Sequence, residues 1–270
     1  ICGKYKTTVT IKVSDQTDLN EVKQDYHSTL SIDQCSNVRI SDITIESKGI
    51  NYGNTDAYSS LAYGDDRTNA IINYGGCAIV IARSDNIFID NIAGRRCGSV
   101  GVLYISSCQD IYINNSFFNA RSLGYAGIAI DNWADRSINP KRTYYFDNIS
   151  ISKEDAVYSA KSGIAFEGDQ IAGSALNGYV SNCIIQDCAI GSDSPTFGSA
   201  ISAIDTTLVA KNITSVNCYI GIHFTKRGGS VNKQDLSILG CKFKDNKVSG
   251  VYINTATNTG DGKSYISNTE

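Results

Sequence analysis

One phrase recurs along the chain: an Asn or Asp is followed at once by a run of alternating apolar and polar residues. Asn and Asp tolerate left-handed backbone and bond to their own main chain in bends. The seven turn residues are Asn37, Asn86, Asp110, Asn148, Asn182, Asn212 and Asp235. Their successive spacings are 49, 24, 38, 34, 30 and 23 residues. The shortest spacing is about 23 residues, and the longer spacings exceed it by different amounts. This pattern predicts a coil in which each turn has about 23 residues and some turns carry inserted loops.

The apolar phrases have the period of two and the Ile, Val and Phe content of β-strands, and no helical stripe separates them. The sequence therefore predicts an all-β protein, a right-handed parallel β-helix of about eight or more rungs of roughly 23 residues with inserted loops. We expect a single domain over 1–270. Residues 1–28 would form partial rungs or a cap, 29–254 the core rungs, and 255–270 the end of the coil.

Composition excludes several classes of partner. The chain has 24 Lys and Arg against 27 Asp and Glu, so it offers no basic field for nucleic acid. No apolar run approaches the roughly 18 residues of a membrane span, and the first residues lack the order of a signal peptide. Met is absent even at position 1, and we expect a piece of a longer protein.

The nine Cys fall inside apolar strand phrases, as in residues 182–190, and their number is odd. Both facts favour reduced thiols that act as small buried hydrophobes over a disulfide framework. No CxxC occurs, and His27 and His223 are the only histidines. We therefore expect no metal and no cofactor.

Three phrases, GIAID (127–131), GIAFE (163–167) and ISAID (201–205), each end on a carboxylate. Aligned as strands, they place their second and fourth positions inward, where Ser202 is the one polar exception. The outward fifth positions of all the aligned strands read Asp33, Ala82, Ser106, Asp131, Glu167, Asp205, Thr225 and Asn254. The three acids would stack on consecutive rungs about 4.8 Å apart, where like charges repel.

The outward third positions on the same rungs are Ala129, Ala165 and Ala203, bounded by Tyr104 and His223. Small residues between larger ones predict a trough with acids along its edge. Crowded carboxylates raise one another's pKa, so one can hold a proton while its neighbour is ionised. An acid beside a base is the arrangement that glycoside hydrolysis requires.

The spacing leaves both stereochemical outcomes open. Adjacent rungs suit a retaining pair, whereas Asp131 and Asp205, two rungs apart, could reach the roughly 6.5–9.5 Å of an inverting pair. Asp169 and Asp135 lie in the following loops and are second-choice catalytic residues. Trp133, the only Trp, could stack on a sugar ring or pack a loop. A calcium site or a solvated row are the alternative interpretations of the acids.

Candidate substrate-binding residues with a basic or imidazole side chain lie near these phrases. Lys226 and Arg227 follow the strand GIHFT (221–225) and would bind an anionic sugar or form a solvated pair. Arg83 has the same two interpretations. His223 is either a wall of the trough or an acid or base.

The rungs GIAID, GIAFE and ISAID, together with SNVRISDITI (36–45) and DNIFIDNIAG (85–94), resemble the pectate-lyase-like β-helix superfamily. Within it, the chain most resembles the central domain of bacteriophage tailspikes, over about residues 29–254. The resemblance implies a homotrimer on a virion tail, with a secreted bacterial enzyme as the alternative location. It also implies cleavage of a bacterial capsule or O-antigen by a Glu and one or two Asp in a groove.

Carried onto this sequence, that role falls on Glu167 with Asp205 or Asp131. The resemblance concerns the fold and includes no catalytic motif: the GHG and RIK phrases of polygalacturonases do not occur. The expected function is an endo-acting glycoside hydrolase. The alternatives are a polysaccharide lyase with a base such as His223, Lys226 or a Tyr, and a non-catalytic adhesin or fibre that binds glycan through Trp133 and Tyr104.

Overall fold

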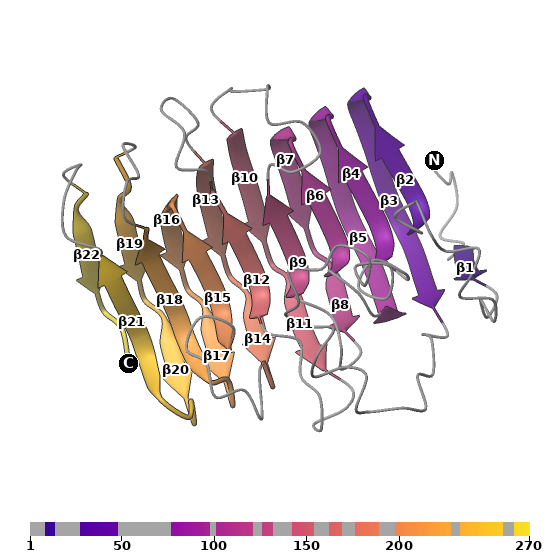
Figure 1. Cartoon of the computed structure of the whole chain (residues 1–270). Helices are drawn as coiled ribbons and strands as arrows, with labels where there is room; N and C mark the ends of the chain where they lie inside the picture. The colour runs from indigo at the N-terminus through magenta and orange to yellow at the C-terminus, as the bar shows by residue number, and fades with distance from the viewer. Residues whose placement is uncertain are drawn as a thin grey trace, which may run out of the picture.

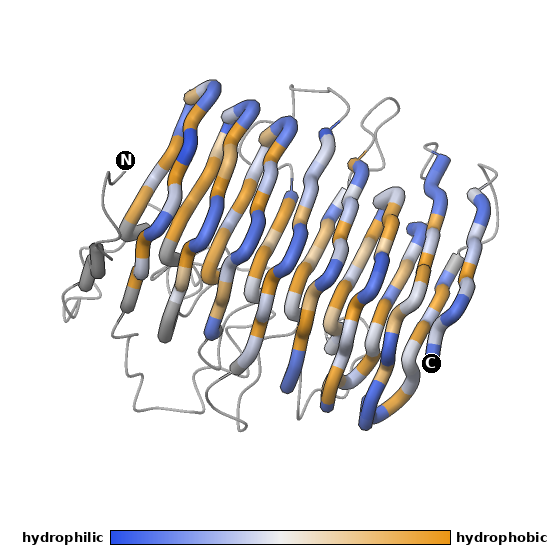
Figure 2. Tube along the Cα trace, turned by 180° about the vertical axis from the view of Figure 1, so that it is seen from behind, coloured by the Kyte–Doolittle hydropathy of each residue, from blue (hydrophilic) through white to orange (hydrophobic). Residues whose placement is uncertain are grey.

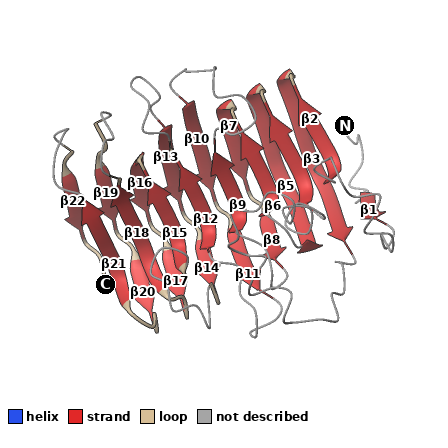
Figure 3. Ribbon diagram, in the orientation of Figure 1, coloured by secondary structure: helices blue, strands red, loops and turns tan. Residues whose placement is uncertain are grey.

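The structure consists of strands throughout the part of the chain that it describes. This computed structural model describes residues 9–13, 28–47, 77–97, 101–120, 126–131, 142–153, 162–168, 176–188, 198–227, 233–255 and 262–270. Within these ranges the fold is all-β, and Figure 3 shows strands joined by turns. The described residues include no helix of the length and apolarity that a membrane span would need.

The strands form two parallel sheets. The smaller has eight strands: β2 (Ser28–Asp33), β4 (Cys77–Ala82), β6 (Gly101–Ser106), β9 (Ala126–Asp131), β12 (Ser162–Glu167), β15 (Ser199–Ile204), β18 (Ile220–Lys226) and β21 (Ser249–Thr255). Neighbours in this sheet are never consecutive in the chain, because strands of the larger sheet lie between them. Parallel pairing therefore repeats from rung to rung, as Figure 1 shows.

The larger sheet has 14 strands arranged as two arms. The first arm holds β3 (Ser36–Ser47), β5 (Asp85–Cys97), β7 (Gln109–Asn114), β10 (Arg142–Asp147), β13 (Leu176–Ser181), β16 (Thr206–Lys211), β19 (Leu236–Leu239) and β22 (Ser264–Ser267). The second arm holds β1 (Val9–Val13), β8 (Phe117–Ala120), β11 (Ser150–Lys153), β14 (Ile184–Gln186), β17 (Thr214–Val216) and β20 (Lys242–Lys244). The long strands β3 and β5 run through both arms.

One apolar core lies between the sheets. A single cluster of buried side chains includes Ile164 and Phe166 from the eight-stranded sheet, Phe146 from the first arm and Ile151 from the second. The rings of Phe146 and Phe166 are 5.7 Å apart. Along each strand alternate residues point into this cluster, and Figure 2 shows the resulting alternation of hydropathy. Each fully buried Ile or Phe contributes about 1.5–3 kcal/mol of transfer free energy.

Left-handed residues mark the bends between strands. The corner between the two arms has one on each of eight rungs, with φ between 49° and 61°: Asp42, Asn91, Asn115, Asn148, Asn182, Asn212, Gly240 and Asn268. These are the residue types that adopt positive φ at least cost. Their side chains also bond from rung to rung, since Asn148 Nδ2 donates to Asn115 Oδ1 at 2.8 Å and Asn212 Nδ2 to Asn182 Oδ1 at 3.0 Å.

The seven turn residues of the sequence phrase belong to two different bends, so their alignment as one repeat is wrong. The corner between the arms holds Asn148, Asn182 and Asn212. The bend at the start of the first arm holds Asn37, Asn86 and Asp110, with φ of 59°, 53° and 52°, and also Asp235. Both bends favour residues that tolerate left-handed backbone, so the same residue types occur in both.

The cysteines have a shared place in the bends. Six cysteines follow a left-handed residue directly: Cys35, Cys108, Cys183, Cys188, Cys218 and Cys241. Each thiol donates to the carbonyl oxygen two residues earlier, as Cys183 Sγ does to Ser181 O at 3.0 Å. Ser84, Ser116 and Thr206 make the same bond with hydroxyls.

These six cysteines are free and five of them are buried, which confirms the prediction of reduced core thiols for Cys108, Cys183, Cys188, Cys218 and Cys241. Burial raises the pKa of Cys108 and of Cys183 to about 12. These two thiols therefore stay protonated at neutral pH and act as hydrogen-bond donors, not as nucleophiles.

Candidate functional site

Two of the three predicted carboxylates lie side by side at the ends of adjacent strands. Asp131 ends β9 and Glu167 ends β12, and the residues just before them, Ile130 and Phe166, are paired in the sheet. Both carboxylate side chains are on the outward face, and both residues are half-buried. This pair confirms the part of the predicted acidic column that joins residues 131 and 167.

Asp205 does not belong to that column, and this part of the prediction is wrong. Glu167 pairs with Ile204, and Ala203 points inward between Phe166 and Phe224. The phrase ISAID is therefore shifted by one residue from the alignment expected from the sequence, and Asp205 follows the strand with a φ of 48°. The polar residue in the inward column, Ser202, was the sequence signal for this shift, since a slip of one residue exchanges the two faces of a strand.

The predicted trough is present as a row of residues but is not open to solvent. Register places these residues along one outward row: Val80, Tyr104, Ala129, Ala165, Ser202, His223 and Tyr252. Ser202 takes the place expected for Ala203. Ala129 and Ala165 are 3% and 1% exposed, so they form no accessible floor. Tyr252, at one end of the row, is 37% exposed, and the other accessible groups lie at the strand ends.

Two hydroxyl groups hold the carboxylate of Asp131. Tyr104 Oη donates to Asp131 Oδ2 at 2.9 Å, and Ser106 Oγ donates to Oδ1. Ser106 pairs directly with Asp131 across β6 and β9. Hydrogen bonds from donors stabilise the ionised form of a carboxylate. Sequence reasoning gave Ser106 no role at the site, although its place in the same outward column pointed to one.

Asp205 instead forms a buried clamp beside Glu167. Its side chain is fully buried and accepts the main-chain N–H of Arg227 at 2.9 Å and Gln234 Nε2 at 3.2 Å. The guanidinium of Arg227 donates from Nε to Asp205 Oδ2 and from Nη2 to the carbonyl oxygen of Gly168. The clamp thus joins the chain on three successive rungs, one of them directly after Glu167.

Gly168 fits this clamp because it has no side chain. A Cβ built at this position would lie 2.1 Å from the carbonyl oxygen of Asp205. Its N–H donates to Ile204 O at 2.8 Å. The main chain on the C-terminal side of Glu167 is therefore fixed both by the absence of a side chain and by hydrogen bonds.

His223 is buried in the outward row. Its Nε2 lies 2.6 Å from Thr225 Oγ1, and its ring lies 5.5 Å from the ring of Tyr252. Burial lowers its pKa, so the imidazole is neutral at neutral pH. A neutral, 2% exposed imidazole fits a wall of the site better than a group that exchanges protons with solvent.

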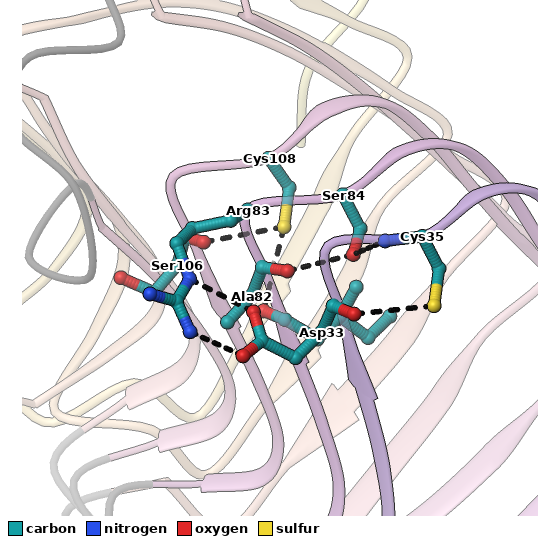
Figure 4. A network of polar contacts seen from close by, with 8 residues as sticks. Asp33, Cys35, Ala82, Arg83, Ser84, Ser106 and Cys108 are labelled. Carbon is teal, nitrogen blue, oxygen red and sulfur yellow. Dashed lines mark hydrogen bonds and ion pairs between the residues drawn. The ribbon is translucent and has the colours of Figure 1, made fainter.

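The remaining basic candidates differ from each other. Arg83, with a φ of 47°, pairs with Asp33 on the preceding rung, where Nε donates to Oδ1 at 2.8 Å. Figure 4 shows this pair beside the hydrogen bonds of Cys35, Ser84 and Cys108. Lys226, expected at the surface, is 7% exposed at the end of β18.

Three candidates lie outside the described residues: Trp133, Asp135 and Asp169. Within the described ranges, no group of three or more His, Cys, Asp or Glu has the arrangement of a metal site.

The chain was compared with family models, curated proteins and solved structures. No protein-family model, no curated protein and no solved structure matches the chain. The function is therefore inferred from the residues of the chain.

Proposed function

We propose that the two sheets close into a right-handed parallel β-helix. Three features support the closure. Each rung passes from the eight-stranded sheet to the first arm, and where a rung is described through the second arm the chain then returns to the eight-stranded sheet. Left-handed residues lie at the bends, and one apolar cluster gathers side chains from both sheets. Parallel strands connected in one sense make a coil.

We further propose that the protein is a polysaccharide depolymerase of the tailspike kind, an endo-acting glycoside hydrolase for a bacterial capsule or O-antigen. The observation that carries this proposal is the pairing of Asp131 and Glu167 at equivalent positions of adjacent strands. Adjacent strands lie about 4.8 Å apart, close to the roughly 5–5.5 Å between the carboxyl groups of retaining enzymes. With Asp205 outside the column, the wider inverting pair loses its second member.

The two hydroxyl donors contact Asp131, so we assign the nucleophile to Asp131 and the general acid to Glu167. Asp131, whose carboxylate accepts hydrogen bonds from Tyr104 and Ser106, attacks the anomeric carbon while Glu167 gives its proton to the departing glycosidic oxygen. A glycosyl ester forms on Asp131. Glu167, now ionised, takes a proton from water, which attacks the anomeric carbon and releases Asp131. The product keeps the anomeric configuration of the substrate.

The test is incubation with a panel of purified capsules and O-antigens. Reducing ends and the ultraviolet absorbance of unsaturated uronides are followed together. We expect reducing ends alone, with retained configuration in the proton NMR spectrum of the first product. Glu167→Gln and Asp131→Asn should each lower the rate at least about 100-fold, whereas Asp33→Asn, in the same column, should not. Unsaturated products would show a lyase, and unchanged rates in both variants would refute the assignment.

The place on a virion tail and the homotrimer belong to the same proposal, and the resemblance to tailspike domains supports them. Sedimentation equilibrium of the chain tests the trimer: a mass of about three chains is expected. A monomer at all concentrations would remove the trimer from the proposal and leave the hydrolase assignment standing.

A further inference from the structure

A ladder of aromatic rings runs along the outer face of the first arm. Phe88, Tyr112, Tyr145 and Tyr179 come from β5, β7, β10 and β13, which are neighbours in the sheet. Successive ring centroids are 4.6, 4.9 and 5.0 Å apart, with angles of 6°, 5° and 13° between the planes. We call these four residues the aromatic ladder.

The ladder presents ring edges and hydroxyl groups to solvent. Phe88, Tyr145 and Tyr179 are 39%, 37% and 39% exposed although their faces cover one another. None of the three tyrosine hydroxyls has a hydrogen-bond partner in the described part of the chain. The pKa of Tyr145 is raised, first by partial burial and then by the neighbouring phenols, so its hydroxyl remains a donor at neutral pH.

Polar columns border the ladder on both sides. On β10 and β13 the outward neighbours are Thr143 and Asn177 on one side and Asp147 and Ser181 on the other. All four are half-buried. The apolar strip is therefore only one residue wide, and hydroxyl, amide and carboxylate groups accompany it along its length.

This shape selects the kind of ligand. A stable protein interface requires an apolar centre wider than one column of residues, with about 1,000 Å² or more buried in total. Between β5 and β13 the ladder and its borders contain no cation but include Asp90, Asp110 and Asp147, which disfavours nucleic acid and anionic polymers along this length. The nearest cations, Arg39 on β3 and Lys211 on β16, lie on the strands just beyond the two ends. A linear glycan offers apolar C–H edges and many hydroxyls, which match aromatic edges between polar borders.

We propose that the aromatic ladder binds an uncharged linear glycan that runs along the stack of rungs. This site lies on the 14-stranded sheet, and the carboxylate pair lies on the eight-stranded one. The ladder would hold a polymer whether or not Asp131 and Glu167 cleave it, so this inference goes beyond the proposed hydrolase. The inference also specifies the ligand of the ladder as an uncharged glycan.

Affinity electrophoresis in gels that contain polysaccharide tests the proposal. The probes are neutral O-antigen polysaccharides and acidic capsular polysaccharides, and the protein is the whole chain carrying Glu167→Gln, so that the gel is not degraded. We expect retardation by at least one neutral probe. Replacing Tyr145 and Tyr179 together by Ser should weaken it at least about tenfold, because truncated aromatic contacts at binding sites commonly cost more than 1 kcal/mol.

Two further variants serve as controls, one for the tyrosine hydroxyl group and one for an aromatic residue outside the ladder. Tyr145→Phe keeps the stacked ring and removes one hydroxyl, and we expect a smaller loss of affinity from it. Tyr265→Ser changes an exposed residue of the same column that Val209 and Ser237 separate from the ladder, and binding should be unchanged. Circular dichroism confirms that each variant is folded.

Each other result overturns the proposal. No retardation of the whole chain by any neutral probe would refute it. Equal retardation of the double variant would place the glycan elsewhere, and binding of acidic probes alone would contradict the charge argument. Concentration-dependent association in the ultracentrifuge that the double variant abolishes would show that a second copy covers the ladder. Reducing ends measured on the Glu167-containing chain report separately on the hydrolase.

Discussion

Two Arg–Asp pairs occupy the same bend of the molecule, and their surroundings differ. In the first, Arg83 is the left-handed residue, and its partner Asp33 ends the strand of the preceding rung. The two side chains are 36% and 40% exposed. In the second, the acid is the left-handed residue: the side chain of Asp205 turns inward and is 0% exposed, and Arg227, itself 46% exposed, reaches it from the next rung.

The difference shows that burial, not residue type, decides what such a pair contributes. An exposed pair is well solvated and contributes about 0–1 kcal/mol. A buried carboxylate that loses its partner is left without solvent, and the cost is about 3–5 kcal/mol. Asp205 also accepts bonds from Gln234 and from the main chain. The second pair is therefore the structural one, and it lies beside Glu167.

The largest effect is expected from Arg227→Ala, which leaves the buried carboxylate of Asp205 without its guanidinium. Because the Arg227 side chain is 46% exposed, we expect less than the loss of a fully buried pair, about 2–3 kcal/mol of stability, measured by urea unfolding. Asp205→Asn keeps an acceptor for the main-chain N–H of Arg227 and should lose less. If Arg227→Ala cost no more than Arg83→Ala, the contrast between the two pairs would be wrong.

A steric change at the same clamp should come next. Gly168→Ala places a methyl group against the carbonyl oxygen of Asp205, which is main chain and cannot turn away. Overpacking of this kind costs about 1–3 kcal/mol. The unfolding midpoint in urea measures it. A variant as stable as the parent would show that the main chain at Gly168 has room to move.

The pH dependence of stability should report the burial of His223. His223 lies on β18, the strand whose end leads into Arg227, and its pKa is lowered by burial. The unfolded chain therefore binds the proton more readily, and stability falls as pH drops below about 6.5 towards the folded pKa. Melting temperatures between pH 7.5 and 5.5 should show the fall, and His223→Gln should flatten the curve. An unchanged slope in the variant would assign the effect to another group.

The smallest effect belongs to the exposed pair. Arg83→Ala should change the free energy of unfolding by about 1 kcal/mol or less, because solvent and salt already screen the pair. Repeating the measurement in 1 M salt should reduce the difference further. A loss comparable with that of Arg227→Ala would mean that Arg83 supports the fold through other contacts.

The strand content and the inward or outward direction of most side chains were predictable, because an alternation of period two fixes which residues of a strand point inward. Ile164, Phe166 and Ile222 all lie in the core as expected. Register was less secure at residues 201–205, where Ile201 and Ala203 alternate with Ser202 and Ile204, so both frames offer apolar side chains to the core, and ISAID was placed in the wrong one. Burial of the outward row could not be deduced either, and neither could the side-chain environment of Lys226, because they depend on contacts across rungs.

The thiols at the bends can be used to measure local unfolding along the molecule. Each of the six cysteines is tied to the carbonyl two residues back, and five of them are buried. A thiol reagent can reach such a sulfur only when its rung opens, so the modification rate of each cysteine reports the free energy of that opening. From Cys35 to Cys241 the thiols lie along the stack, and mass spectrometry of a timed labelling series would show in which order the rungs open.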